Sequence, residues 1–140
     1  MKEIDNLIKI SQLYGSDNRF VIAGGGNTSY KNRDKIWVKA SGASLATITE
    51  DGFAILDRAR INLMTDKVYS SDTAEREEQV KRDLEEATLT KGKRPSVETS
   101  MHNVIRYAFV VHLHPTLVNG LMCSKNAEAE LLKIFGDKSV

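Results

Sequence analysis

Two short segments rich in β-forming residues flank a polar turn, and this pattern constrains the fold more than any other. Residues 27–31 and 36–40 are predicted strands, and the Asn-Arg-Asp-Lys sequence between them is a predicted turn. Strands joined by so short a turn pair antiparallel. Residues 53–57 and 109–114 are further predicted strands, the second ended by Pro115. The sequence therefore predicts a mostly antiparallel sheet.

Apolar residues at helical spacing surround these strands. The first predicted helix covers 2–14 and stops at Gly15, and the last ends at Gly136. A charge-rich stretch at 73–90 has a narrow apolar stripe, which is typical of a surface helix. A further helix is predicted after the Ser96 cap, with an apolar face of Val97, Met101, Val104, Ile105 and Ala108. Two more predicted helices cover 116–123 and 127–135. This order of elements indicates the α/β or α+β class.

Composition excludes several functions. Twenty Lys and Arg against 19 Asp and Glu give a net charge of +1, so we expect no nucleic-acid partner and no polybasic membrane surface, both of which need an excess of cations. No stretch approaches the roughly 18 apolar residues of a membrane span, so we expect a soluble, cytoplasmic protein. One cysteine, Cys123, allows no intrachain disulfide, and its apolar surroundings predict a buried structural thiol.

The sharpest local motif is His112-Leu113-His114 at the end of the last predicted strand. Side chains two apart on a strand point to one face, so both imidazoles project together while Val111 and Leu113 point to the core. Two adjacent imidazoles are suitable ligands for Zn²⁺ or a similar divalent ion. The alternative is a pair of half-exposed histidines on a polar sheet face.

A second motif, Arg94-Pro95-Ser96-Val97-Glu98, opens the helix that precedes this strand. Glu98 has two interpretations: a carboxylate that complements the helix dipole, or a general base or ligand beside the histidine pair. Ser96 and the free N–H groups of the helix start are able to hold an anion such as phosphate. His102 lies four residues after Glu98 and is either a third ligand or a packed or solvated histidine.

The glycine-rich segment Gly24-Gly25-Gly26-Asn27 fits neither common nucleotide motif. It lacks the GxGxxG spacing and precedes a strand, and no Gly-Lys-Ser/Thr follows. It is either a plain turn or, together with Ser41-Gly42, a pair of loops that bind a phosphate. The chain has no Gly-x-Ser-x-Gly elbow, which argues against a serine hydrolase.

Taken together, the motifs resemble the class II aldolase/adducin domain. Gly-Gly-Gly-Asn-Thr-Ser, Lys-Ala-Ser-Gly, Arg-Pro-Ser-Val-Glu and Val-His-Leu-His-Pro occur in the order of that family. Within this family, the motif sequences are most similar to those of the aldolase part of bifunctional rhamnulose-1-phosphate aldolase/alcohol dehydrogenases. The resemblance covers nearly the whole of 1–140 and implies a three-layer α/β/α fold with a mostly antiparallel central sheet.

The resemblance also implies a reaction. Such enzymes cleave a ketose 1-phosphate, of the rhamnulose or fuculose type, to dihydroxyacetone phosphate and an aldehyde, with Zn²⁺ as a Lewis acid. His112 and His114 would be metal ligands and Glu98 the catalytic acid/base. The phosphate would be bound by Asn27, Ser41, Gly42 and Ser96. Val97 stands where the family often has a second serine, so one phosphate contact is missing.

The third metal histidine of the family lies downstream of the His-x-His pair, and no histidine follows His114 here. We therefore expect a truncated or split aldolase domain, incomplete as a fold. Two alternatives are a non-catalytic module like the adducin head and a pentulose-5-phosphate 4-epimerase, which shares the retro-aldol step. Because family members usually form tetramers, the resemblance also implies a homo-oligomer.

Overall fold

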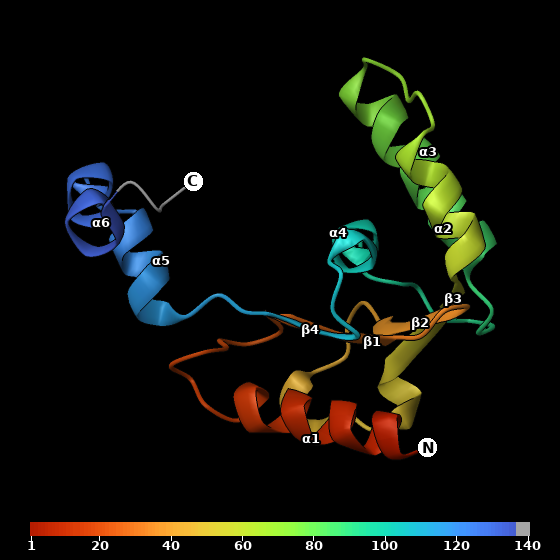
Figure 1. Ribbon diagram of the computed structural model, residues 1–140, viewed down its shortest axis with the longest axis horizontal. Helices are drawn as coiled ribbons and strands as arrows, with labels where there is room; N and C mark the ends of the chain where they lie inside the picture. The colour runs from red at the N-terminus through yellow and green to blue at the C-terminus, as the bar shows by residue number, and fades with distance from the viewer. Residues whose placement is uncertain (137–140) are drawn as a thin grey trace.

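The structure, a computed structural model, describes residues 1–136 and is built on a four-stranded antiparallel sheet (Figure 1). Its strands lie in the order β3-β2-β1-β4. The hairpin is confirmed, and so is each predicted strand, although the last one is shorter. The bounds are β1 (Asn27–Lys31), β2 (Lys35–Lys39), β3 (Phe53–Asp57) and β4 (Phe109–His112).

One face of the sheet is covered by helix α1 (Lys2–Gly15) and the short 3-10 helix η1 (Leu45–Thr47). Apolar side chains of both helices, of the sheet and of the adjoining loops form a core there, comprising Ile4, Leu7, Val21, Trp37, Leu45, Ile48 and Phe53. A buried hydrogen bond of 2.7 Å between the hydroxyls of Ser11 and Thr28 also joins α1 to β1. Burial of this apolar surface is what holds α1 against the sheet.

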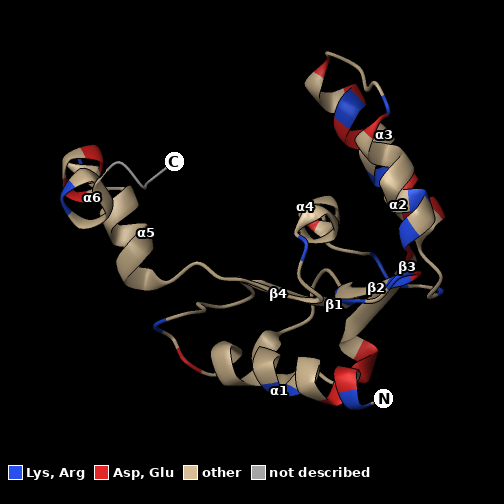
Figure 2. Cartoon of the chain, in the orientation of Figure 1, with Lys and Arg blue, Asp and Glu red and all other residues tan. Residues whose placement is uncertain are grey.

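Helices α2 (Arg58–Thr65) and α3 (Thr73–Ala87) lie over the opposite face at the β2–β3 side (Figure 1). The second core lies there and comprises Ile36, Val38, Ala40, Ala54, Leu56, Ile61, Met64, Leu84 and Ala87. The exposed side of α3 carries charges of both signs (Figure 2). Helices therefore lie on both faces of the sheet, and the expected three-layer α/β/α architecture is confirmed.

The apolar face predicted for the helix after Ser96 is wrong. Helix α4 (Thr99–Val104) starts two residues later than expected, and Val97, Met101 and Val104 are exposed. The buried side chains are polar ones, Thr99, His102 and Asn103. The reason lies in the sheet, because the part of β1 beneath α4 presents Ser29 and Lys31 rather than apolar groups. A polar helix face thus packs on a polar strand face.

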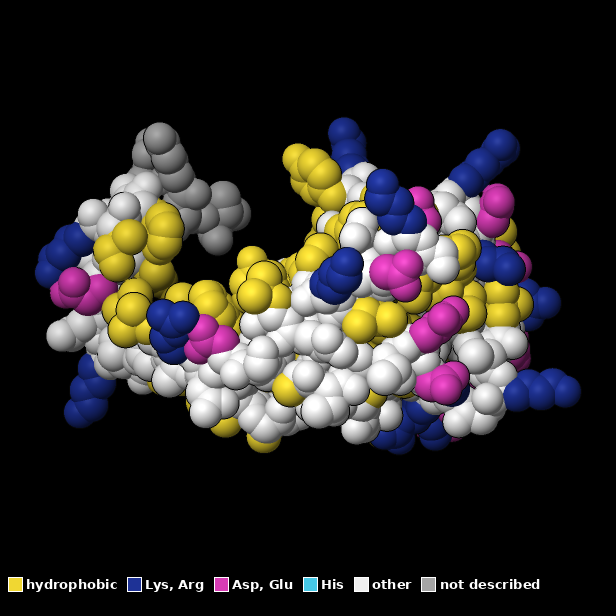
Figure 3. Space-filling view, turned by 90° about the horizontal axis from the view of Figure 1, so that it is seen from below, with side chains coloured by type: hydrophobic (Ala, Val, Ile, Leu, Met, Phe, Trp, Pro, Cys, Tyr) yellow, Lys and Arg dark blue, Asp and Glu magenta, His cyan; other side chains and the backbone are white. Residues whose placement is uncertain are grey.

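Helices α5 (Thr116–Met122) and α6 (Ala127–Phe135) lie beyond the end of β4, away from the layers (Figure 1). Neither contains a buried residue. Apolar side chains gather on this end of the molecule (Figure 3), among them Leu117, Met122, Ile134 and Phe135. Cys123 is exposed, so the expected buried thiol is wrong, because α5 packs on no layer that could cover it. Within 1–136, no helix has both the length and the apolarity that a membrane span requires.

Candidate functional site

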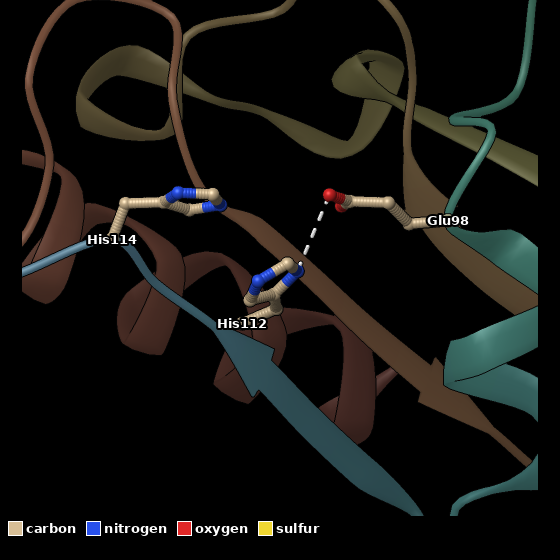
Figure 4. A group of neighbouring side chains, drawn as sticks. All are labelled: Glu98, His112 and His114. Carbon is tan, nitrogen blue, oxygen red and sulfur yellow. Dashed lines mark ion pairs between the residues drawn. The ribbon is translucent and has the colours of Figure 1, made fainter. Parts of the chain in front are cut away.

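Glu98, His112 and His114 come together at one edge of the sheet (Figure 4). One ligand atom from each lies within 4.8 Å of the other two. The imidazole rings of His112 and His114 have centroids 4.8 Å apart, and Nδ1 of His112 lies 3.3 Å from Oε1 of Glu98. The expected meeting of the helix start with the strand end is therefore present in the fold.

Local structure explains this convergence. His112 is the last residue of β4 and His114 follows two residues later, so the alternation of an extended chain carries both rings to the same side. Leu113 points the other way and packs against the α1 core. Val111, which was also expected in the core, is 37% exposed on the edge strand β4, so that expectation is wrong.

Glu98 is held by the turn that precedes α4. Its backbone N–H donates to Oγ of Ser96 at 3.2 Å, and its carbonyl accepts from the N–H of His102 at 3.0 Å. Ser96 thus stabilises the turn before α4 rather than the N-terminus of the helix itself. The Glu98 carboxylate is left about one third exposed, beside the equally half-buried ring of His112.

The donor set fits a divalent metal ion. Two imidazoles and a carboxylate are ligands that Zn²⁺ takes in proteins. Nδ1 of His112 is buried and has no hydrogen-bond partner among residues 1–136, a state that costs free energy unless another group satisfies it. Donors that share one tetrahedral ion at about 2.0–2.1 Å lie about 3.3 Å apart. The ligand atoms of the three side chains lie within 4.8 Å of one another, and those of Glu98 and His112 are 3.3 Å apart.

His102 lies outside this group of three, as a fully buried side chain of α4. Its Nδ1 is 2.7 Å from Oγ of Ser29, and its ring centroid is 6.5 Å from that of His112. Burial lowers the pKa of His102 to about 4, although the negative charge of Glu98 opposes the shift. The packed interpretation of this histidine agrees with the structure, and the ring is neutral at pH 7.

Two buried lysines support the same region, and sequence reasoning missed both. Lys31 donates to the backbone carbonyl of His102 at 2.7 Å, and burial lowers the pKa of Lys31 to about 8. Lys39 donates to the carbonyl of Ala43 at 2.9 Å, and burial lowers its pKa while the charge of Glu98 raises it. Lys39 therefore contributes positive potential close to Glu98. The sequence signal that could have found Lys39 is its place at the start of the Lys-Ala-Ser-Gly motif.

The residues expected to bind phosphate are in two places. Asn27 is buried in β1 opposite His112, and its Oδ1 has no hydrogen-bond partner among the described residues. Ser41 and Gly42 lie in the loop after β2, where Ala40 pairs with Pro95. Because Pro95 directly precedes Ser96, this loop lies beside the segment that leads to Glu98. Among residues 1–136, no hydrogen bond joins Ser41 or Gly42 to Asn27.

The conformation and surroundings of Gly26 explain why a glycine stands before Asn27. Its φ of +74° is in the left-handed region, and a Cβ would lie 3.0 Å from Leu45 and 3.3 Å from the carbonyl oxygen of His112. A side chain there would push the loop away from the strand that carries the histidines. Glycine at this position therefore lets the backbone of the turn pack directly against the end of β4.

Comparisons with known proteins agree with this geometry. The family model of the class II aldolase and adducin N-terminal domain matches residues 5–139, and the chain belongs to this family. A solved N-terminal class II aldolase domain of a conserved protein from Thermoplasma acidophilum superposes with a TM-score of 0.79 at 30% identity. That alignment covers 96% of this chain and 65% of the solved one.

A curated relative, an uncharacterized oxidoreductase named YuxG from Bacillus subtilis (strain 168), is 32% identical over 148 aligned residues. The match covers 99% of this chain but only 21% of the relative. This chain therefore corresponds to about one fifth of that protein, and the word oxidoreductase describes the larger protein.

Proposed function

We propose that this chain is a metal-dependent class II aldolase domain that reversibly cleaves a ketose 1-phosphate to dihydroxyacetone phosphate and an aldehyde. The observation that carries the proposal is the group formed by Glu98, His112 and His114 in a member of this family. The proposed substrate is a ketose 1-phosphate of the rhamnulose or fuculose type. This is supported by the similarity of the motif sequences to those of the bifunctional rhamnulose-1-phosphate enzymes.

His112 and His114 would hold the ion, which supplies Lewis-acid polarisation of the substrate's oxygen atoms when bound. Glu98 moves the proton. In the cleavage direction its carboxylate accepts a proton from the substrate hydroxyl as the carbon–carbon bond breaks, and a proton is returned to the carbon left on the dihydroxyacetone phosphate part. Glu98 is suited to this because its oxygen atoms are partly exposed and its backbone is fixed by Ser96 and His102.

Buried polar side chains lie next to this group. His102, Ser29 and Asn27 are buried beneath it and are uncharged at pH 7. Because these three side chains carry no charge, they attract a cation less than a carboxylate would. The negative charge that attracts the metal ion therefore comes from Glu98. Asn27, Ser41, Gly42 and Ser96 are the proposed phosphate ligands.

A direct assay tests this proposal. The purified chain, loaded with Zn²⁺, is incubated with rhamnulose 1-phosphate and fuculose 1-phosphate, and dihydroxyacetone phosphate is measured through a coupled dehydrogenase. We expect turnover that chelation abolishes and that His112→Ala does not support. Stoichiometric metal binding without turnover of either substrate would contradict the aldolase proposal and favour the adducin-like module. Conversion of a pentulose 5-phosphate would favour the epimerase.

The proposed homo-oligomer has its own test. The exposed apolar side chains of α5 and α6 offer a surface that a second copy is able to cover. Sedimentation of the wild-type chain should show a species larger than 15.6 kDa, and Leu117→Glu should reduce its mass. A wild-type chain that stays monomeric at about 50 μM would overturn this expectation.

A further inference from the structure

We propose that Arg94 is a substrate-binding residue whose guanidinium, together with Ser41 and Gly42, holds the phosphate of the substrate. The inference rests on the proposed function, which supplies the phosphomonoester. It adds a positively charged ligand to a phosphate site that would otherwise consist of hydroxyl, amide and backbone groups.

Two hydrogen bonds fix Arg94 against the loop after β2. Its Nη2 donates to Oγ of Ser41 at 2.8 Å, and its backbone carbonyl accepts from the N–H of Ser41 at 2.9 Å. The Ser41 hydroxyl accepts the guanidinium proton, so its own hydrogen stays free to donate to an anion. Two donors, one of them charged, are therefore joined at the same point of the surface.

The Ser41 loop is rigid and open. Ala43 N–H donates to the carbonyl of Ala40 at 3.2 Å, and Gly42 has a φ of +86°. A hydrogen bond across four residues with a left-handed third residue is a type II turn. The Lys39 ammonium donates to the carbonyl of Ala43 from below. A ligand at this turn therefore needs little ordering of the backbone.

Space and a free donor are present at the tip of this turn. A Cβ built on Gly42 would meet no atom within 4 Å. Across residues 1–136, the N–H of Gly42 donates to no partner. An anion placed beside this turn would thus meet the Gly42 N–H, the Ser41 hydroxyl and the Arg94 guanidinium from one side.

Within residues 1–136, the Arg94 guanidinium also forms no ion pair. No carboxylate of the described residues lies within 4.0 Å of its nitrogen atoms. One of its five N–H donors is used by Ser41, and the planar remainder suits two-point binding of a phosphate. Val97, which has no hydroxyl to offer and is 81% exposed, stands three residues later. Arg94 is thus placed to supply the contact that Val97 cannot make.

Arg94 is four residues before Glu98 along the chain. Arg94 and Glu98 lie on the same short segment, whose Pro95 pairs with Ala40 at the end of β2. Ser41 and Arg94 line a groove of about 710 Å³ whose other wall is α3. Arg76 lines the same groove from α3, but it donates to the Ser71 carbonyl and the Thr73 hydroxyl. This makes Arg76 a matched control of equal charge.

The test is a titration of the purified chain with inorganic phosphate at constant ionic strength, followed by the amide signals of Ser41 and Gly42 in NMR spectra. We expect saturable shifts of both signals in the wild type. Arg94→Met should weaken the phosphate affinity about tenfold or more, Arg94→Lys should restore part of it, and Arg76→Met should change it less than twofold. The Arg94 side chain is exposed, and unchanged thermal unfolding would show that the variant is folded.

Two results would overturn the inference: no shift of the Ser41 and Gly42 signals with phosphate, or an equal loss of affinity in Arg94→Met and Arg76→Met. A Zn²⁺ titration of the same samples keeps the proposed function separate. Zinc affinity that is lost in His112→Ala but retained in Arg94→Met supports the metal site whatever the phosphate titration shows. Absence of zinc binding with an intact phosphate site would count against the aldolase alone.

Discussion

Oε1 of Glu98 lies 3.3 Å from Nδ1 of His112, at the point where the start of α4 meets the end of β4. At this distance the two atoms form an ion pair when the imidazole is protonated, yet the alignment of a hydrogen bond is missing and Nδ1 stays unsatisfied. A bound cation would satisfy the imidazole and the carboxylate together. The proton-moving group and one proposed metal ligand are thus in contact.

Glu98→Gln keeps the shape of this side chain and removes its charge and its basicity. We expect the cleavage rate to fall by about 10²–10⁴, the usual contribution of a positioned acid/base group. Zinc affinity should fall as well, because an amide oxygen is a poorer ligand for Zn²⁺ than a carboxylate. The measurements are kcat for ketose 1-phosphate cleavage and competition for Zn²⁺ with a chromophoric chelator. Glu86→Gln, on the exposed side of α3, is the control, and equal rates in both variants would contradict the role of Glu98.

Ser29→Ala tests the buried pair beneath the site. Nδ1 of His102 would lose its partner at 2.7 Å in a fully buried position. Leaving a buried polar atom unsatisfied costs about 1–3 kcal/mol, so the free energy of unfolding in urea should fall by that amount. Ser44→Ala should have little effect, since Ser44 is exposed and its side chain makes no cap hydrogen bond. Equal stability of the two variants would show that the Ser29–His102 contact contributes nothing.

The parts of this structure that follow from local pattern were predictable from the sequence. The hairpin of β1 and β2 is fixed by its short turn, and the His-x-His pair by strand alternation. The buried face of α4 was not predictable, since it depends on which residues β1 places beneath it. Helix α2 was missed because its cap, Asp57, ends a strand and only Ile61 and Met64 are buried.

The candidate site shows the same division. Its three central residues carry chemistry in their identity and were found from spacing. The contact between Arg94 and Ser41 joins residues that are 53 positions apart, so only the paired backbones of the folded chain bring them together. The signal that could have found Arg94 is its place at the start of the motif that ends in Glu98.

Lys31 should make stability rise with pH. Burial, with a smaller contribution from the charge of Arg58, lowers its pKa to about 8, against 10.5 for the ordinary lysine. Between pH 8 and pH 10.5, Lys31 of the unfolded chain holds a proton that Lys31 of the folded chain has lost. The contribution of Lys31 to the free energy of unfolding therefore increases over this range. Urea unfolding of the wild type and of Lys31→Met across pH 7.5–10, a range chosen to span that window, checks this. Curves that stay parallel would mean that Lys31 titrates alike in both states.

Gly15→Ala tests the contact between α1 and η1. A Cβ at Gly15 would lie 2.4 Å from the backbone nitrogen of Ala46 and 2.4 Å from the carbonyl carbon of Leu45, so α1 would have to move off the segment it packs on. Overpacking of this kind costs about 1–3 kcal/mol, against a gain in helix propensity of up to about 1 kcal/mol. We expect a net loss of stability in urea unfolding. Gly24→Ala is the control, because a Cβ there meets nothing within 4 Å. If Gly15→Ala were as stable as Gly24→Ala, α1 would not be seated against η1 as closely as the structure has it.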